Sequence, residues 1–87
     1  MKVKSTKHFE KHLKKCPADI QKKFVECYDE LIKAKNIQQI DCEKLKGYKT
    51  FFRVRLGNYR LGFELQEEST IELLEIMDRK EIYRYFP

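Results

Sequence analysis

Two alternating stretches, residues 50–56 and 59–66, constrain the fold of this chain most strongly, and Gly57 and Asn58 separate them. In the first stretch, phenylalanine, valine and leucine alternate with arginine. Successive side chains of a strand point to opposite faces of a sheet, and a two-residue turn containing glycine can join antiparallel strands. The sequence therefore predicts a β-hairpin that buries one face and keeps the other face cationic.

The residues before the hairpin predict helices. Phe9, Leu13 and Cys16 recur at helical spacing, Thr6 can act as the N-cap, and Pro17 ends the pattern. A second helical pattern begins at Asp19 and fades near Lys35 and Asn36. We expect these elements: a strand at residues 2–5, a helix between Thr6 and Pro17, a helix from Asp19 to about Asn36, a loop over 36–42, strands over 50–56, 59–66 and 70–77, and a helical turn within 79–86.

These elements define an α+β fold. The expected architecture is an N-terminal strand and a two-helix hairpin packed on a small, mainly antiparallel β-sheet, with a short C-terminal helical segment. Residues 70–77 are apolar at odd and even positions alike, which is typical of a strand covered on both faces. A chain of 87 residues has room for one core, so residues 1–87 are expected to form a single domain.

Charge is distributed unevenly along the chain. The net charge is +5, and residues 44–60 hold six basic residues and no acid. Such asymmetry favours polyanionic partners. The three cysteines suit neither a disulfide framework nor a zinc site, and no apolar run is long enough for a signal peptide or a membrane span. We therefore expect a cytoplasmic protein that has no membrane partner.

The basic stretch has the chemistry of a polyanion-binding surface. Arginine grips two phosphate oxygens with its planar fork, and its charge does not titrate away. The arginines share the outward parity of two adjacent strands, so their guanidinium groups can converge; the alternative is that they only keep an edge strand soluble. The candidate residues are Lys44, Lys46, Lys49, Arg53, Arg55 and Arg60.

Few groups could move a proton beside these arginines. The only histidines, His8 and His12, lie four residues apart on the first predicted helix and could form half of a metal site. The other ligands are missing, so a solvated helix face is favoured, and we predict no metal and no cofactor. Tyrosine remains, because a cationic environment stabilises phenolate and an aromatic ring can stack on a nucleobase. The alternative for a tyrosine is a core-edge position with its hydroxyl in water.

The C-terminal half resembles the RelE/ParE superfamily of bacterial and archaeal toxins, through the run KLKGYKTFFRVRLGNYRLGFEL and the later segment IMDRKEIYRYF. The element order is similar over residues 1–87, and the resemblance is specific from Lys44 onward. The family pattern has a basic leader, a Tyr-Arg-Leu triplet and a late arginine followed by a terminal tyrosine. Residues 44–47 and 59–61 match the first two features, and Arg79 with Tyr83 matches the third.

The resemblance implies a RelE-like microbial RNase fold and a type II toxin that cleaves mRNA in the ribosomal A site. In this reaction a ribose 2′-hydroxyl attacks its own 3′-phosphate without a metal. The implied partners are a RelB-like antitoxin and the ribosome with its mRNA and 16S rRNA. The implied roles fall to Arg60 and Arg79 for the phosphorane, Arg53 and Arg55 for phosphate binding and proton transfer, Lys44, Lys46 and Lys49 for holding RNA, and Tyr83 as base or stacking platform, with Tyr85 in its place if the spacing from Arg79 is kept.

The chain departs from the family pattern at two places. Arginine stands at positions 53 and 55 where the RelE branch has lysine, and a guanidinium is a poorer general acid because it holds its proton. Asp78 stands where many relatives have a histidine or a basic residue, and it either orients Arg79 through an ion pair or weakens catalysis. Two other functions stay open: a non-catalytic ParE-like toxin that inhibits DNA gyrase, and an RNA-binding module without cleavage.

Overall fold

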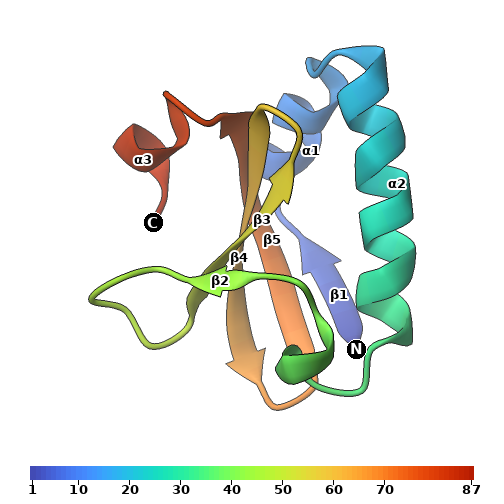
Figure 1. Cartoon of the computed structure of the whole chain (residues 1–87), viewed down its shortest axis with the longest axis vertical. Helices are drawn as coiled ribbons and strands as arrows, with labels where there is room; N and C mark the ends of the chain where they lie inside the picture. Colours follow the sequence, from blue (N-terminus) through green and yellow to red (C-terminus); the bar gives the residue numbers. More distant parts are fainter.

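The computed structural model describes all 87 residues (Figure 1). Its elements are β1 (Lys2–Ser5), α1 (Lys7–Lys14), α2 (Ala18–Lys33), a 3₁₀ turn (Ile37–Gln39), β2 (Glu43–Lys44), β3 (Phe51–Leu56), β4 (Tyr59–Glu67), β5 (Thr70–Asp78) and α3 (Ile82–Tyr85). The predicted α+β class and order of elements are confirmed. None of the helices is both long enough and apolar enough to cross a bilayer.

The five strands form one mixed sheet in the order β1-β5-β4-β3-β2. β1 runs parallel to β5, and the other neighbouring strands are antiparallel. The predicted hairpin is confirmed: β3 and β4 pair directly, with Arg55 opposite Arg60. Gly57 occupies the turn with φ of 62°, a left-handed conformation that glycine adopts without steric cost.

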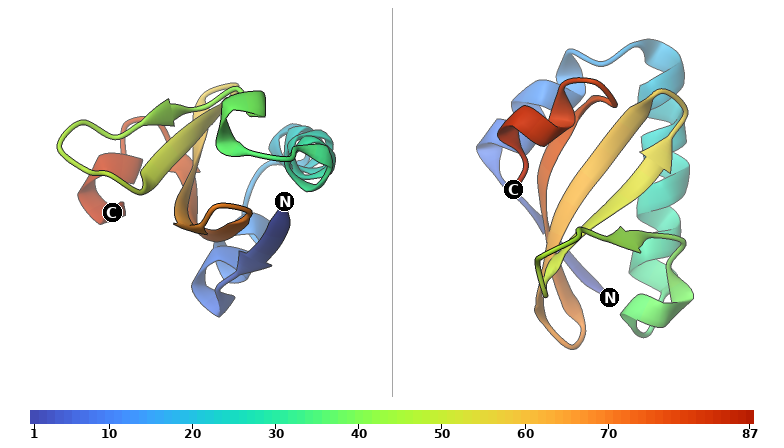
Figure 2. Two further views of the ribbon diagram at one scale, coloured as in Figure 1. Left: turned by 90° about the horizontal axis from the view of Figure 1, so that it is seen from below. Right: turned by 60° about the vertical axis from the view of Figure 1, so that its left-hand side comes forward.

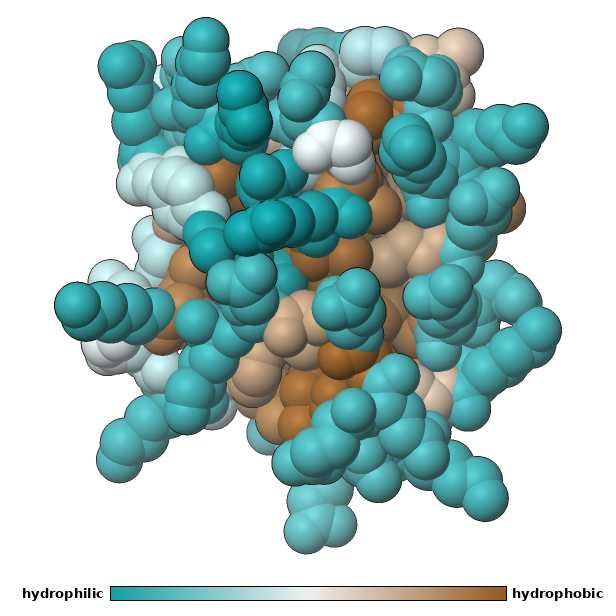
Figure 3. Space-filling model, viewed as in Figure 1, coloured by the Kyte–Doolittle hydropathy of each residue, from teal (hydrophilic) through white to brown (hydrophobic).

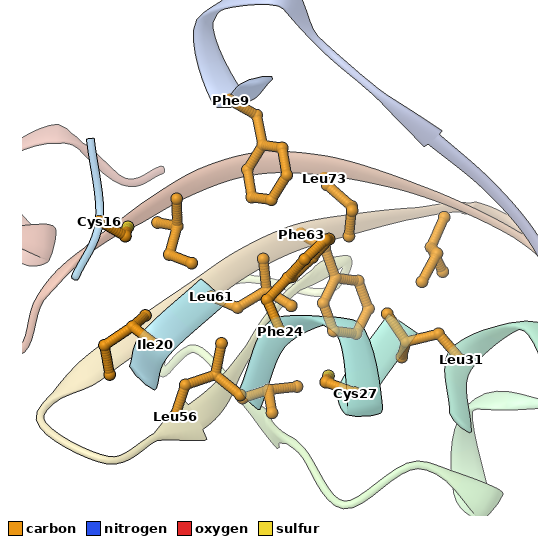
Figure 4. Packing of buried hydrophobic residues seen from close by; sticks show 13 residues of the cluster. Phe9, Cys16, Ile20, Phe24, Cys27, Leu31, Leu56, Leu61, Phe63 and Leu73 are labelled. Atoms are coloured by element: carbon orange, nitrogen blue, oxygen red, sulfur yellow. The ribbon is translucent and has the colours of Figure 1, made fainter. Parts of the chain in front are cut away.

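Helices α1 and α2 cover one face of the sheet, and α3 lies on the other side (Figure 2). Thr6 caps α1 as predicted, because its Oγ1 accepts a hydrogen bond of 3.0 Å from the Phe9 amide. Phe9 and Phe24 from the helices pack against Leu61 and Phe63 from β4 in the main core (Figure 4). Burying one such side chain contributes about 1.5–3 kcal/mol, so this cluster holds the helical hairpin on the sheet.

A smaller core fixes the C-terminal segment on the opposite face. It consists of Leu45, Ile82 and Phe86, with Leu74 and Met77 packed against it. The Phe86 ring lies directly over Gly62 of β4, where a Cβ atom would be only 2.7 Å from two ring carbons. Glycine at this position therefore allows the close approach that seats the segment.

The stretch between α2 and β3 differs from the predicted loop. It contains the 3₁₀ turn, which Asn36 caps: the Asn36 Oδ1 accepts a hydrogen bond of 3.1 Å from the Gln38 amide. It is followed by β2, a two-residue edge strand that pairs Glu43 with Arg53 and Lys44 with Phe52. Neither element is long enough to produce a periodic pattern, which is why the sequence did not indicate them.

The apolar pattern of β5 has a second cause besides the cover on both faces. Gly62 pairs with Glu75 and Phe63 with Leu73, so Leu74 is an extra residue in the ladder, a β-bulge. Leu74 packs in the small core beside α3, whereas the Glu75 carboxylate contacts α1. The extra residue breaks the strict alternation, so that Glu75 and the next residue, Ile76 of the main core, both face the helices.

Candidate nucleic-acid interface

The hairpin presents its arginines on the face that carries α3. Arg55 lies opposite Arg60, and Arg53 lies opposite Gly62, the glycine beneath Phe86. The alternate residues of both strands enter the main core, so the predicted division into a buried face and a cationic face is observed. In Figure 3 the most hydrophilic residues gather beside the strands, toward α3.

Arg53 joins the hairpin to the C-terminal segment. Its Nη1 donates a hydrogen bond to the hydroxyl of Tyr83, and its guanidinium carbon lies 5.5 Å from the centre of that ring. Its Nη2 donates to a carboxylate oxygen of Glu43 at 2.9 Å, while its Nε is buried without a hydrogen-bond partner. A buried donor that lacks a partner is costly, so the contacts of the two Nη atoms hold this guanidinium at some cost in free energy.

Glu43 is a residue of this surface that the sequence reasoning missed. It forms ion pairs with Arg53 and, at 3.4 Å, with Arg55. The hydrogen bond from Arg53 is the main reason that the pKa of the Glu43 carboxyl lies below its ordinary value, and the charges of both arginines add to the effect. Its position immediately before Lys44 gave no signal, because only the pairing of β2 with β3 brings it to the arginines.

Arg60 lies close to three other arginine side chains. Its Nη1 donates to the carbonyl oxygens of Gly57 and Tyr59, both at 2.9 Å, which anchors the guanidinium at the hairpin turn. Burial lowers the pKa of Arg60, and repulsion from Arg55, Arg53 and Arg79 lowers it further. A bound anion would relieve this repulsion, so the electrostatics favour phosphate at this point.

Arg79 reaches the same region from the end of β5. Its amide donates to the Asn58 carbonyl at 2.8 Å, which places it beside the hairpin turn, and its side chain forms no ion pair. Of the two alternatives for Asp78, the ion pair with Arg79 is therefore not formed. Instead, an Asp78 carboxylate oxygen accepts a hydrogen bond of 2.8 Å from the Lys80 amide.

The lysines and the remaining tyrosines are divided between the groove and other surfaces. A groove of about 500 Å³ is lined by Lys44, Lys46, Tyr48, Arg53 and Tyr83, together with Glu43, Leu45, Phe86 and Pro87. We call it the basic groove. The predicted residues Lys49 and Tyr85 are exposed but do not line it, and Tyr59 packs against the main core.

One group of side chains has the composition and spacing of a metal site, and it lies outside the basic groove. It consists of His8 and His12 on α1 and Glu75 on β5. The residues of the groove offer no comparable set, since Glu43 is engaged by two arginines.

Comparison with known proteins by sequence and by structure finds relatives of one kind. The family model described as the ParE toxin of a type II toxin-antitoxin system, parDE, matches residues 3–83. The chain is 38% identical over 89 aligned residues to Toxin RelE3 of Methanocaldococcus jannaschii, covering 100% of both chains.

Two solved complexes contain similar chains. One is the RelB-RelE antitoxin-toxin complex from Methanococcus jannaschii, with a TM-score of 0.79, 37% identity, and coverage of 98% of this chain and 100% of the other. The second is the archaeal RelE-RelB complex from Pyrococcus horikoshii OT3, with a TM-score of 0.71, 27% identity, and coverage of 92% and 96%. The similarity thus extends over nearly the whole chain in each case.

Proposed function

The chain belongs to the RelE/ParE superfamily of type II toxin-antitoxin toxins, and from that membership we propose that it is a ribosome-dependent endoribonuclease. In this proposal it cleaves mRNA in the A site, where a ribose 2′-hydroxyl attacks the adjacent 3′-phosphate. Its partners are then the ribosome with mRNA and 16S rRNA, and its place of action is the cytoplasm.

The observation that carries the proposal is the contact between Arg53 and Tyr83. It unites two segments that are distant in the sequence, so that a phenol stands beside the Arg53 guanidinium. A cation that donates to the phenol oxygen stabilises phenolate, the form that can accept a proton from the 2′-hydroxyl. The same ring faces the basic groove, where a nucleobase could stack on it.

The arginines account for the charge that the reaction develops. The phosphorane carries more negative charge than the phosphodiester, and preorganised cations lower the barrier by stabilising this excess. Arg60 is held rigidly by two carbonyl oxygens and Arg79 approaches it from β5, so both are suited to this role. Arg53 and Arg55 would exchange Glu43 for phosphate, and Lys44 and Lys46 would hold the strand in the groove.

We also propose a RelB-like antitoxin as the partner that restrains this toxin. Two similar chains have been crystallised in RelB-RelE complexes. The outer face of α2 exposes an apolar stripe at helical spacing, formed by Val25, Tyr28 and Ile32. Such a stripe fits the apolar face of a partner helix.

Primer extension on translated mRNA tests the nuclease proposal. Inducing the wild-type chain should produce cuts in phase with codons, and Arg79→Ala should remove most of them, because one of the phosphorane-binding cations is lost. Growth inhibition by the wild type without any cuts would contradict the proposal. It would favour a ParE-like toxin that acts on gyrase, an alternative that the matching ParE family model keeps open.

A comparison of two tyrosines tests the assignment of the base. Tyr83→Phe should lower the cleavage rate of the purified protein on programmed ribosomes about 100-fold, the usual contribution of a general base. Tyr85→Phe is the matched control and should retain the wild-type rate, since Tyr85 is 60% exposed and lies outside the groove. Full activity of Tyr83→Phe together with loss in Tyr83→Ala would assign Tyr83 to stacking instead.

A further inference from the structure

Three side chains with metal-binding chemistry meet between α1 and β5. His8 and His12 stand one turn apart on α1, and their rings are 4.1 Å apart between centroids. The Nε2 atom of His8 lies 2.5 Å from one Glu75 carboxylate oxygen, and the Nδ1 atom of His12 lies 2.6 Å from the other. The donor atoms of all three residues lie within 4.8 Å of one another.

The carboxylate of this cluster is buried, unlike that of an ordinary surface ion pair. Glu75 is only 2% exposed, although it is the one charged residue in the buried part of the chain. A buried carboxylate is expensive unless positive charge or hydrogen bonds compensate it, and here both imidazoles turn toward it. The His8 side chain is 56% exposed and that of His12 is 24% exposed, so solvent reaches the cluster from one side.

We propose that His8, His12 and Glu75 form a binding site for a divalent cation of the zinc class. Two imidazoles and one carboxylate are a donor set that Zn²⁺ accepts, with water in the fourth position, and the exposed side of the cluster gives that water access. Tetrahedral Zn²⁺ with bonds of about 2.0–2.1 Å keeps its donors roughly 3.3 Å apart. Both ring nitrogens now lie closer than this to the Glu75 carboxylate, at 2.5 and 2.6 Å, so both imidazole rings must turn outward slightly to admit the cation.

Binding exchanges protons for the metal. The imidazole N–H groups that point at Glu75 lose their protons to solvent, and the nitrogen lone pairs and the carboxylate coordinate the cation. The bound cation would then join α1 to β5 through its coordination bonds. Since Arg53, Arg55 and Arg60 lie on the opposite face of the sheet, beside α3, the site would stabilise the fold rather than take part in RNA cleavage.

Titration of the full chain without a polyhistidine tag tests the site, with Zn²⁺ alone as the probe. Calorimetry should give one Zn²⁺ per chain, and Zn²⁺ at about 100-fold above its Kd should raise the Tm by about 10–20 °C. Co²⁺ should produce visible d–d bands of four-coordinate geometry without a near-ultraviolet thiolate band. A thiolate band would assign the metal to the cysteines and overturn the proposal.

Matched glutamine variants make the test specific. His8→Gln and Glu75→Gln should each weaken Zn²⁺ binding at least about tenfold, the least expected for a lost ligand. Glu75→Gln can still hydrogen-bond both imidazoles, and His8 is exposed enough that its replacement should not unfold the chain. Lys11→Gln, an exposed change on the same helix, is the control and should bind as the wild type does. Absence of saturable binding in the wild type, or unchanged affinity in both ligand variants, would show that the cluster is only an imidazole–carboxylate network.

Discussion

Replacing Arg60 with alanine is expected to lower the rate of ribosome-dependent mRNA cleavage about 100-fold or more. The positive charges of Arg53, Arg55 and Arg79 all repel that of Arg60. An anion bound at Arg60 would relieve this repulsion. Its guanidinium is already fixed by the carbonyls of Gly57 and Tyr59, and little reorganisation is needed when the phosphorane forms. The measurement is the single-turnover rate on programmed ribosomes.

Arg84→Ala is the matched control for this prediction. Arg84 is 73% exposed on α3, pairs only with Glu81, and is not among the arginines whose charges act on Arg60, so its loss should leave cleavage unchanged. Circular dichroism of both variants should give similar Tm values, which would separate a chemical effect from unfolding. A cleavage rate in Arg60→Ala equal to that of the wild type would sink the role proposed for this arginine.

Adding one methyl group at position 62 is expected to lower both stability and activity. The Cβ of Gly62→Ala would meet the Phe86 ring at 2.7 Å, and overpacking of this kind costs about 1–3 kcal/mol in free energy of unfolding. Alanine in a strand is otherwise better than glycine by about 0.5–1 kcal/mol, so a loss of stability is itself diagnostic of the clash. If Phe86 moves, Tyr83 on the same short segment leaves Arg53, and cleavage falls.

Urea denaturation of a double-mutant cycle checks this mechanism. Phe86→Ala alone should cost about 3 kcal/mol, because it empties part of the small core. In that background Gly62→Ala should cost nothing, because the ring with which it collides is gone. An equal cost of Gly62→Ala in both backgrounds would mean that the glycine is needed for some other reason.

The elements with a long hydrophobic period could be predicted from the sequence. The hairpin followed from the alternation over residues 52–56 and 59–66, and the first helix from Thr6 and the apolar stripe behind it, so the cationic face was also foreseen. The short elements could not be predicted, because the two residues of β2 carry no period. That omission hid Glu43, whose ion pairs with the arginines exist only through the pairing of β2 with β3.

The site was harder to predict where it depends on contacts between distant segments. The sequence could place Tyr83 and Tyr85 near the end of the chain but could not show which of them meets Arg53, since that follows from the seat of Phe86 on Gly62. The extra residue in β5 concealed Glu75 in the same way. Residues 70–77 are apolar at odd and even positions, so their pattern did not show which side chains face the helices, and the third partner of His8 and His12 was not recognised.

The bulge at Leu74 also determines how acid and base are segregated in this small protein. In a regular ladder, residues directly opposite share a face, so without the insertion Glu75 would follow Gly62 and point at Phe86. A carboxylate would then lie beneath the C-terminal segment, on the face of the sheet that carries the arginines. The inserted residue instead turns Glu75 toward the helices. Its negative charge therefore lies on the face opposite the arginines of β3 and β4 and does not neutralise them.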